Sequence, residues 1–299
     1  MTRFPYGERV SSLLGAIELG GTKTVCGVGT NPEDLVQHRF GTSDPSTTLT
    51  TAMDFLTEFP GVAAVGIASF GPVELRKSHA DYGYITTTPK KEWPQTDVVG
   101  PVSSALGVPV GFDTDVDAAA LGEGRWGAAR DLANYVYLTV GTGIGGGAVV
   151  NGQVAHGLVH PEMGHVSVIR RQDDFFEGTC PFHGDCLEGM ASGPAVASRW
   201  GTKPEDVGAD AIDLEAYYLA QGLRNIIYTL APERIVVGGG LASLADLLPS
   251  LRLELEKTLG GYPALKELKT DEFVSRVGLG DDSGVLGGLI LAEQALDSL

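Results

Sequence analysis

The most constraining feature of the sequence is a pattern that occurs twice, in which two apolar segments are joined by a turn of glycine and threonine. It occurs in "LLGAIELGGTKTVCGVGT" and again in "YVYLTVGTGIGGGAVVNGQV". Aligning residues 18–22 with residues 139–143 places glycine on glycine at the turn. Two such hairpins, each opening one half of the chain, predict two related lobes with a cleft between them.

The rest of the chain alternates strand-like and helix-like segments, which is typical of an α/β architecture. The segment "PERIVVGGGLASLADLLPSLRLEL" predicts a strand, a glycine turn and a helix. The last segment, "GVLGGLILAEQALDSL", predicts a helix with a face of small residues. At 299 residues the chain is long enough for two lobes, each with its own core.

Charge and composition exclude several classes of protein. A formal net charge of −17 argues against a nucleic-acid partner, because a polyanion needs a basic surface. The N-terminal segment is a poor signal peptide, since Glu18 and the glycines interrupt its apolar run, and no apolar stretch is long enough to cross a membrane. Three cysteines are too few for a secreted disulfide scaffold. We therefore expect a soluble, cytoplasmic protein.

Three glycine-rich turns at strand ends are candidate nucleotide-binding loops: "LGGTK", "GTGIGGG" and "VVGGGLAS". A phosphate needs several backbone N–H donors at close range, and glycine permits that approach. Any one of these turns is more simply explained as a tight turn that binds nothing, but three of them at strand ends favour a nucleotide. None fits the P-loop or the dinucleotide-binding pattern, so we expect neither of those folds.

Three carboxylates follow a predicted strand at alternate positions, Asp113, Asp115 and Asp117. A hydroxyl that accepts a phosphoryl group benefits from a carboxylate that orients it and takes its proton. The alternative is that these residues cap the following helix, which aspartate favours. One of the three suffices as a cap, so we expect at least one to face the cleft.

The segment "TCPFHGDCLEG" contains two of the three cysteines, and with His165 it completes the pattern H-x14-C-x2-H-x2-C. Thiolate and imidazole ligands in this spacing favour a closed, structural zinc site made of His165, Cys180, His183 and Cys186. The alternative is a disulfide between Cys180 and Cys186. Cys26 lies in an apolar strand and is expected to be a buried small side chain.

Two glutamates flank this cluster in the sequence. Glu162 precedes His165 by three residues, and Glu188 follows Cys186 by two. A loop held by a metal could keep both carboxylates rigid in a cleft, where they would accept hydrogen bonds from a polyhydroxy ligand. In this interpretation zinc is part of the scaffold and has no open coordination position.

The chain resembles ROK-family sugar kinases, most closely the bacterial fructokinase branch. The motifs "AIELGGTKT", "SFGP", "DTDVDAAALGE", "LTVGTGIGGG", "HPEMGH", "CPFHGDCLEG" and "IVVGGG" occur in the family's order, from about residue 14 to the C-terminal helix. The resemblance implies a two-lobed actin-like and hexokinase-like ATPase fold of duplicated ribonuclease H-like domains with a zinc-binding loop. It implies an N-terminal lobe at 1–116, a larger lobe at 117–284, and a C-terminal helix at about 285–299 that packs back on the first lobe.

The resemblance also implies roles for individual residues. The family motif N-D-x-N occurs here as Thr114-Asp115-Val116-Asp117, so Asp115 takes the place of the catalytic base and both asparagines are replaced. Thr114, Asp117, Glu162, His165 and Glu188 match sugar-binding positions, and His165 also matches a zinc ligand. The positions that match the MgATP site are Glu18, Gly20, Gly21, Thr22 and Lys23 in the first turn, Gly141, Thr142 and Gly143 in the second, and Gly238, Gly239 and Gly240 in the third.

The implied activity is transfer of the γ-phosphate of MgATP to the 6-hydroxyl of a hexose, D-fructose by the branch resemblance, in a homodimer with Mg²⁺ and structural Zn²⁺. One alternative is a kinase for glucose, mannose or N-acetylmannosamine. Another is a sugar-responsive transcriptional regulator, which is disfavoured because only about a dozen residues precede the first hairpin. A third is a zinc-stabilised sugar-binding module without catalysis.

Overall fold

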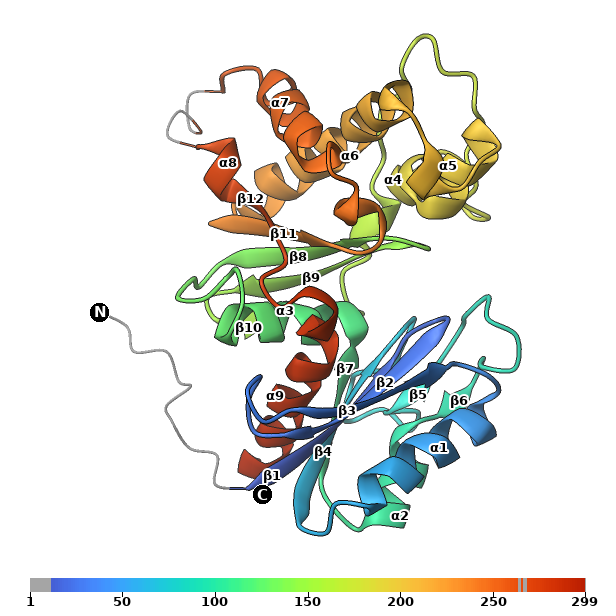
Figure 1. Ribbon diagram of the computed structural model, residues 1–299, viewed down its shortest axis with the longest axis vertical. Helices are drawn as coiled ribbons and strands as arrows, with labels where there is room; N and C mark the ends of the chain where they lie inside the picture. The colour runs from blue at the N-terminus through green and yellow to red at the C-terminus, as the bar shows by residue number, and fades with distance from the viewer. Residues whose placement is uncertain (1–11, 263–264, 266–267, 299) are drawn as a thin grey trace. The chain divides into compact units, whose positions relative to one another are not determined.

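The computed structural model describes residues 12–262, 265 and 268–298, and these form two compact units (Figure 1). The first unit contains the chain up to Arg130, the segment Val154–His160, and the chain from Leu279 onward. The second contains Asp131–Gln153 and Pro161–Gly278. The boundary placed at residue 116 from the sequence lies within helix α3 (Asp115–Arg125), whereas the first compact unit continues to Arg130. Residues 1–11 and 299 of the expected lobes lie outside the described residues.

The first unit is built on a five-stranded sheet whose described strands have the order β3-β2-β1-β4-β7. β1 and β2 are antiparallel across the first glycine turn, while β4 and β7 run parallel to β1 and β4 respectively. Both faces of β1 are buried, because Ile17 packs with the helices α1 and α2 and Leu14 packs with α9. The elements are β1 (Leu13–Leu19), β2 (Lys23–Gly29), β3 (Val36–Gly41), α1 (Pro45–Thr57), β4 (Val62–Ser69), β5 (Tyr84–Ile85), β6 (Thr96–Asp97), α2 (Val99–Leu106), β7 (Val110–Thr114), α3 and α9 (Ser283–Asp297).

The second unit repeats this topology with the order β10-β9-β8-β11-β12. β8 and β9 are antiparallel across the second glycine turn, and β11 and β12 continue the sheet in parallel. The duplication expected from the two hairpins is therefore present in the topology. The elements are β8 (Tyr135–Val140), β9 (Ile144–Val150), β10 (Gln153–Val154), η1 (Met163–His165), α4 (Leu187–Ala191), α5 (Gly193–Trp200), η2 (Pro204–Asp206), α6 (Ala209–Leu230), β11 (Arg234–Gly238), η3 (Leu241–Ser243), α7 (Leu247–Leu259), α8 (Thr270–Phe273), β12 (Val274–Arg276) and, belonging to the first unit, η5 (Gly280–Asp282).

Within the first unit, α9 packs unusually close to the sheet and to α3. A methyl group added to Gly287 would overlap the backbone of Ala118, and one added to Gly66 on β4 would overlap the carbonyl of Gly288. The small-residue face predicted for this helix is thus what allows backbone to approach backbone. Glu123 on α3 reinforces the contact, since its carboxylate accepts hydrogen bonds from the Ser283 hydroxyl at 2.6 Å and from the Leu279 amide at 3.0 Å.

Replacing Gly287 with alanine should lower the free energy of unfolding by about 1–3 kcal/mol, as overpacking does elsewhere. The helix propensity of alanine opposes this by about 1 kcal/mol, but it does not relieve an overlap with backbone. Urea denaturation measures the change. Gly41→Ala is the matched control, because nothing lies within 4 Å of the added methyl there. Equal midpoints for the two variants would contradict the close approach of α9.

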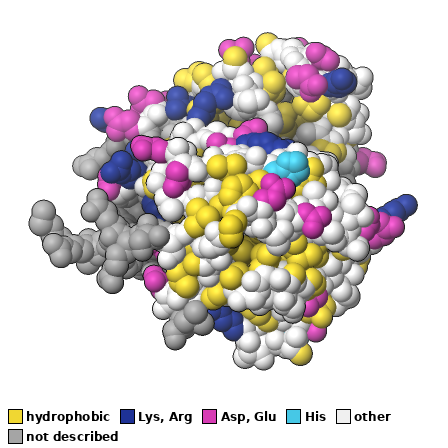
Figure 2. All heavy atoms as spheres, turned by 60° about the horizontal axis from the view of Figure 1, so that its bottom comes forward, with side chains coloured by type: hydrophobic (Ala, Val, Ile, Leu, Met, Phe, Trp, Pro, Cys, Tyr) yellow, Lys and Arg dark blue, Asp and Glu magenta, His cyan; other side chains and the backbone are white. Residues whose placement is uncertain are grey.

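Surface features of the described residues are mixed. None of their helices combines the length and the apolar character that crossing a bilayer requires. Figure 2 shows one face of the molecule, on which apolar side chains are interspersed with uncharged ones and acidic side chains lie near the basic ones.

Candidate active site

The first glycine turn joins β1 to β2 in the first unit. Gly21, Thr22 and Lys23 are exposed there. The backbone carbonyls of the turn already have partners, because the Thr42 hydroxyl donates to Gly20 at 2.8 Å and the Lys90 ammonium donates to Gly21 at 2.7 Å. Lys90 was not singled out in the sequence, and it places a positive charge against this turn. An exposed turn that presents a lysine and has its carbonyl groups occupied is suited to an anion.

The second and third turns come together in the second unit. The third turn passes so close to β8 that a methyl on Gly239, which has φ of +89°, would overlap the backbone of Val140. A methyl on Gly141 would lie 3.7 Å from the amide nitrogen of Gly240. Glycine at 239 is therefore needed for approach as well as for the backbone angle, whereas the contact at 141 is an ordinary one. Two of the three candidate nucleotide loops share one edge of the second sheet.

Glu188 lies directly against the second turn. Its Oε2 accepts a hydrogen bond from the Ile144 amide at 2.9 Å, and a methyl on Gly143 would approach that oxygen to 2.8 Å. The segment before it is held by the Leu187 amide, which donates to the Val166 carbonyl at 3.0 Å. The structure thus places this predicted sugar-binding carboxylate between the glycine turn and the Cys/His cluster.

In the same unit, Glu162 directly precedes the short helix η1 and His165 is its last residue. The His165 amide donates to the Glu162 carbonyl at 3.0 Å, which closes this turn. Gly164 between them lies against the backbone of Ile144, where a methyl would overlap the carbonyl group. η1 is therefore fixed on β9, the same strand whose Ile144 amide donates to Glu188. The structure brings all three predicted sugar ligands of this unit onto neighbouring segments.

Asp115 is the first residue of α3 and is partly buried. Burial is the main cause that raises its pKa to about 6, and Asp117 adds to the rise, whereas the hydrogen bond from the Val116 amide and the charge of His160 oppose it. Glu18, at the end of β1, has its pKa raised to about 7, first by burial and then by Asp115. The two carboxylates therefore share one electrostatic environment in the first unit.

Thr114 and Asp117 are buried at the start of α3, with 2% and 0% of their surface exposed. The Thr114 hydroxyl caps the helix, since it accepts from the Asp117 amide at 3.0 Å and lies 2.8 Å from Oδ2 of the same residue. The helix cap is therefore Thr114 and not one of the three aspartates. Asp117 donates its amide hydrogen to this cap.

His156 was not recognised from the sequence, yet it contacts the same helix start. Its Nε2 lies 3.1 Å from Oδ1 of Asp113 and 3.4 Å from Oδ2 of Asp117. Hydrogen bonds to these carboxylates raise the pKa of His156 to about 10, against the effect of burial. Nothing in the local sequence marked this histidine, because its partners are about forty residues away in the chain.

The four predicted metal ligands His165, Cys180, His183 and Cys186 meet in the second unit. Their ligand atoms all lie within 4.8 Å of one another. The sulfur–nitrogen distances are 3.5, 3.8 and 3.6 Å, and a tetrahedral zinc site with ordinary bond lengths has edges of about 3.6 Å. The cysteines are free thiols, so the disulfide alternative has no support here. The residues therefore fit a zinc ion.

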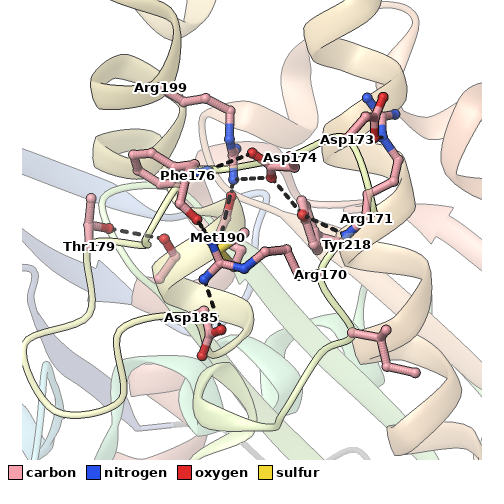
Figure 3. Close-up of polar contacts among 12 residues, drawn as sticks. Arg170, Arg171, Asp173, Asp174, Phe176, Thr179, Asp185, Met190, Arg199 and Tyr218 are labelled. Atoms are coloured by element: carbon pink, nitrogen blue, oxygen red, sulfur yellow. Dashed lines mark hydrogen bonds and ion pairs between the residues drawn. The ribbon is translucent and has the colours of Figure 1, made fainter.

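A buried polar network holds the segment that leads into this cluster (Figure 3). Tyr218 on α6 donates to Asp174 at 2.6 Å, and Arg199 on α5 pairs with the same carboxylate at 3.3 Å. The Arg199 guanidinium also lies 4.4 Å from the centre of the Phe176 ring and donates to the Met190 carbonyl at 2.9 Å. This arrangement fixes the chain before Cys180 against two helices.

Arg170 forms a second set of contacts, which joins the beginning and the end of the segment that contains the Cys/His cluster (Figure 3). Arg170 pairs with Asp185 at 3.0 Å, and its guanidinium also donates to the Phe176 carbonyl. The Thr179 amide donates to the Gly189 carbonyl at 2.9 Å. The polypeptide on both sides of the cluster is thus tied together by hydrogen bonds that do not involve the metal ligands.

Replacing Cys180 with serine should abolish zinc binding, because a tetrahedral site loses one of four ligands. Elemental analysis of chelator-washed protein should find about one zinc per chain in the wild type and close to none in the variant. The thermal unfolding midpoint should also fall. Cys26→Ser is the matched control, since it removes a buried thiol on β2 outside the cluster. Retention of zinc by the Cys180 variant would contradict the site.

The α/β fold with a duplicated five-stranded sheet is shared with solved sugar kinases of the ROK family. A ROK-family glucokinase from Streptomyces griseus, solved with glucose and AMPPNP, matches this fold with a TM-score of 0.76 at 24% identity, over 94% of this chain and 99% of its own. The ROK family model matches residues 14–295, and the chain belongs to the ROK family.

Relatives similar to this chain include named fructokinases. The fructokinase of Pediococcus pentosaceus is 40% identical over 287 residues, which span 95% of this chain and 99% of the relative. The fructokinase of Zymomonas mobilis is 40% identical over 291 residues, which span 94% and 96%. The resemblance stated from the motifs is thereby confirmed at the level of the family.

Proposed function

We propose that this chain is an ATP-dependent fructokinase that acts in the cytoplasm and transfers the γ-phosphate of ATP to the 6-hydroxyl of D-fructose. The observation that carries the proposal is the 40% identity to named fructokinases along nearly the whole chain. The predicted site residues support it. Asp115 is a carboxylate at a helix start in the first unit, and Glu188 lies beside a glycine turn in the second.

Asp115 is the proposed base. A carboxylate with a pKa of about 6 is ionised at neutral pH but retains more basicity than an exposed aspartate. It would accept a hydrogen bond from the 6-hydroxyl and take the proton as the oxygen attacks phosphorus. Phosphoryl transfer asks little covalent chemistry of a protein, so orientation of this hydroxyl is the main contribution.

The glycine turns are the proposed phosphate and adenosine ligands. The N–H groups of Gly20 and Gly141 close the turns by donating to the Lys23 and Gly143 carbonyls at 3.0 and 2.9 Å. The N–H groups that follow them, in Gly21–Thr22 and Thr142–Gly143, would stabilise charge on the phosphoryl oxygens, and Gly238–Gly240 would face the adenosine. Lys23 adds a positive charge to the first turn, as does Lys90. Magnesium, when bound with ATP, would neutralise further negative charge on the phosphates. We assign Glu18 as the carboxylate near the magnesium and the phosphates.

Glu162, His165 and Glu188 are the proposed ligands of the sugar hydroxyls. Oε2 of Glu188 is occupied by the Ile144 amide, which leaves Oε1 for a hydroxyl group. His165 turns Nδ1 toward the thiols, so its Nε2 can donate to the sugar while Nδ1 binds zinc. The burial of Thr114 and Asp117 favours an indirect role, in which they act on the sugar through the position of Asp115.

Zinc is proposed as a structural ion that keeps His165 and Glu188 in place, with His165, Cys180, His183 and Cys186 as its ligands. A homodimer is proposed from the family resemblance, and light scattering measures it. The second candidate function is glucose phosphorylation, which the fold match to a protein described as a glucokinase favours.

ADP release with MgATP should be fastest with fructose when fructose, glucose, mannose and N-acetylmannosamine are compared at equal concentrations. Identification of the product as fructose 6-phosphate completes the test. Preference for glucose would replace the fructokinase assignment with the second candidate function, and preference for mannose or N-acetylmannosamine would replace it with a kinase for that sugar. Absence of turnover with all four sugars would refute the kinase proposal.

Replacing Asp115 with asparagine should lower kcat by at least about 100-fold, the ordinary contribution of a general base, with a smaller change in KM for the sugar. The variant keeps the size of the side chain but cannot take the proton. Steady-state kinetics at saturating ATP measures both constants.

Asp44→Asn is the matched control, because Asp44 caps α1 through the Thr47 amide and asparagine caps equally well. Its kcat should stay within about twofold of wild type. In the wild type, kcat/KM should also decline below about pH 6, as protonation of Asp115 removes the base. Near-normal kcat in the Asp115 variant would show that another group takes the proton.

A further inference from the structure

His156 belongs to a short segment that has an unusual place in the chain. Val154–His160 packs with the first unit, although the residues on either side of it belong to the second. Within that segment His156 reaches two carboxylates at the start of α3, at 3.1 Å from Asp113 and 3.4 Å from Asp117. The same segment ends at the buried His160, whose charge acts on Asp115. Both histidines therefore bear on the helix start that carries the proposed base.

The two carboxylates need a cation because of their burial. Asp117 has none of its surface exposed, and Asp113 has 5%. Thr114 provides Asp117 with only an uncharged hydrogen bond, and Oδ1 of Asp117 has no hydrogen-bond partner among the described residues. Buried charges are costly unless they are paired, and removal of one partner of such a pair is strongly destabilising.

The acidic side chain at position 117 is one of the two departures from the family motif, which has asparagine there. Asparagine would bring no charge to the helix start. Aspartate adds one next to Asp115, and that charge contributes to the raised pKa of Asp115. A cation that faces Asp117 offsets this effect, and the imidazole of His156 is placed to supply it.

We propose that His156 is a positioning residue for Asp115, whose imidazolium ties Val154–His160 to Asp113 and Asp117 and so holds the start of α3. The proposal rests on the proposed function, because it assigns the base to Asp115. According to this proposal, the effects of His156 and Asp117 on catalysis depend on each other. Aspartate at 117 requires the histidine, and asparagine at 117 does not.

Four variants test this dependence: His156→Gln, Asp117→Asn, the double variant, and His79→Gln as the control. His79 lies 3.6 Å from Glu74 and 3.9 Å from Asp81, so it is a histidine among carboxylates elsewhere in the first unit. We expect His156→Gln to lower kcat about tenfold, since a displaced base costs rate without loss of binding. KM for fructose should change less.

Rescue is the decisive comparison. Asp117→Asn alone should lower kcat less than His156→Gln does, because His156 keeps its ion pair with Asp113. The double variant should recover most of the kcat that His156→Gln loses, since the uncompensated charge is gone. A histidine that served only to fill space would show no such rescue.

Two readouts do not depend on catalysis. Titration of the imidazole signals by NMR should assign to His156 a pKa well above the ordinary 6.5, about 10 in the wild type, and a lower value after Asp117→Asn. The thermal unfolding midpoint should fall more for His156→Gln in the presence of Asp117 than in the presence of asparagine. Both measurements test the ion pair even if none of the four sugars is phosphorylated.

Three outcomes would overturn the proposal. One is wild-type kcat and stability in His156→Gln. Another is a kcat loss that Asp117→Asn does not rescue, which would give His156 a role other than charge balance. The third concerns metal, because the ligand atoms of His156, Asp113 and Asp117 also lie within 4.8 Å of one another. If elemental analysis finds a second metal equivalent that His156→Gln loses, a cation rather than the imidazolium balances the charge.

Discussion

Burial of negative charge at the start of α3 is the constraint on which the first unit depends. Asp113, Asp115 and Asp117 occupy alternate positions where β7 ends and the helix begins. The helix start offers its unpaired N–H groups and the positive end of its dipole. These groups stabilise one buried carboxylate, but several buried carboxylates need further hydrogen bonds or a positive charge. The Thr114 cap and the His156 contact supply the remainder, and the backbone packing of α9 on α3 keeps the helix where these contacts form.

In the second unit the corresponding constraint is a long irregular segment between η1 and α4. Such a segment has few backbone hydrogen bonds of its own, and other groups must hold it. The polar network of Asp174, Arg199 and Tyr218 fixes its first part, and the Cys/His cluster fixes its second. Because the network is independent of the metal ligands, part of the segment is anchored by the protein alone. The cluster then determines the position of Glu188, which follows Cys186 by two residues.

The sequence predicted those features that depend on local pattern. The two glycine hairpins specified the duplicated sheet, and the spacing of histidine and cysteine brought four side chains to one place. What it could not predict were contacts between distant residues. His156 meets Asp113 across 43 positions of the chain, and Lys90 reaches Gly21 across 69 positions. The burial of Asp117 was hidden for the same reason, since an acidic residue in a helix start is usually exposed.

Asp115 and Asp117 thus reach a similar pKa in different surroundings. Asp115 is partly buried and has no cation in direct contact among the described ion pairs, so its pKa rises to about 6. The pKa of Asp117 also rises to about 6 through burial, although the hydrogen bond from His156 opposes the rise. Removal of the histidine would leave only the Thr114 hydrogen bond to oppose burial and the charge of Asp113, and Asp117 would then bind a proton more readily. The identity of residue 117 and that of residue 156 therefore have to be interpreted together. An aspartate in place of the motif's asparagine is compatible with a working base where a distant segment brings a cation to it.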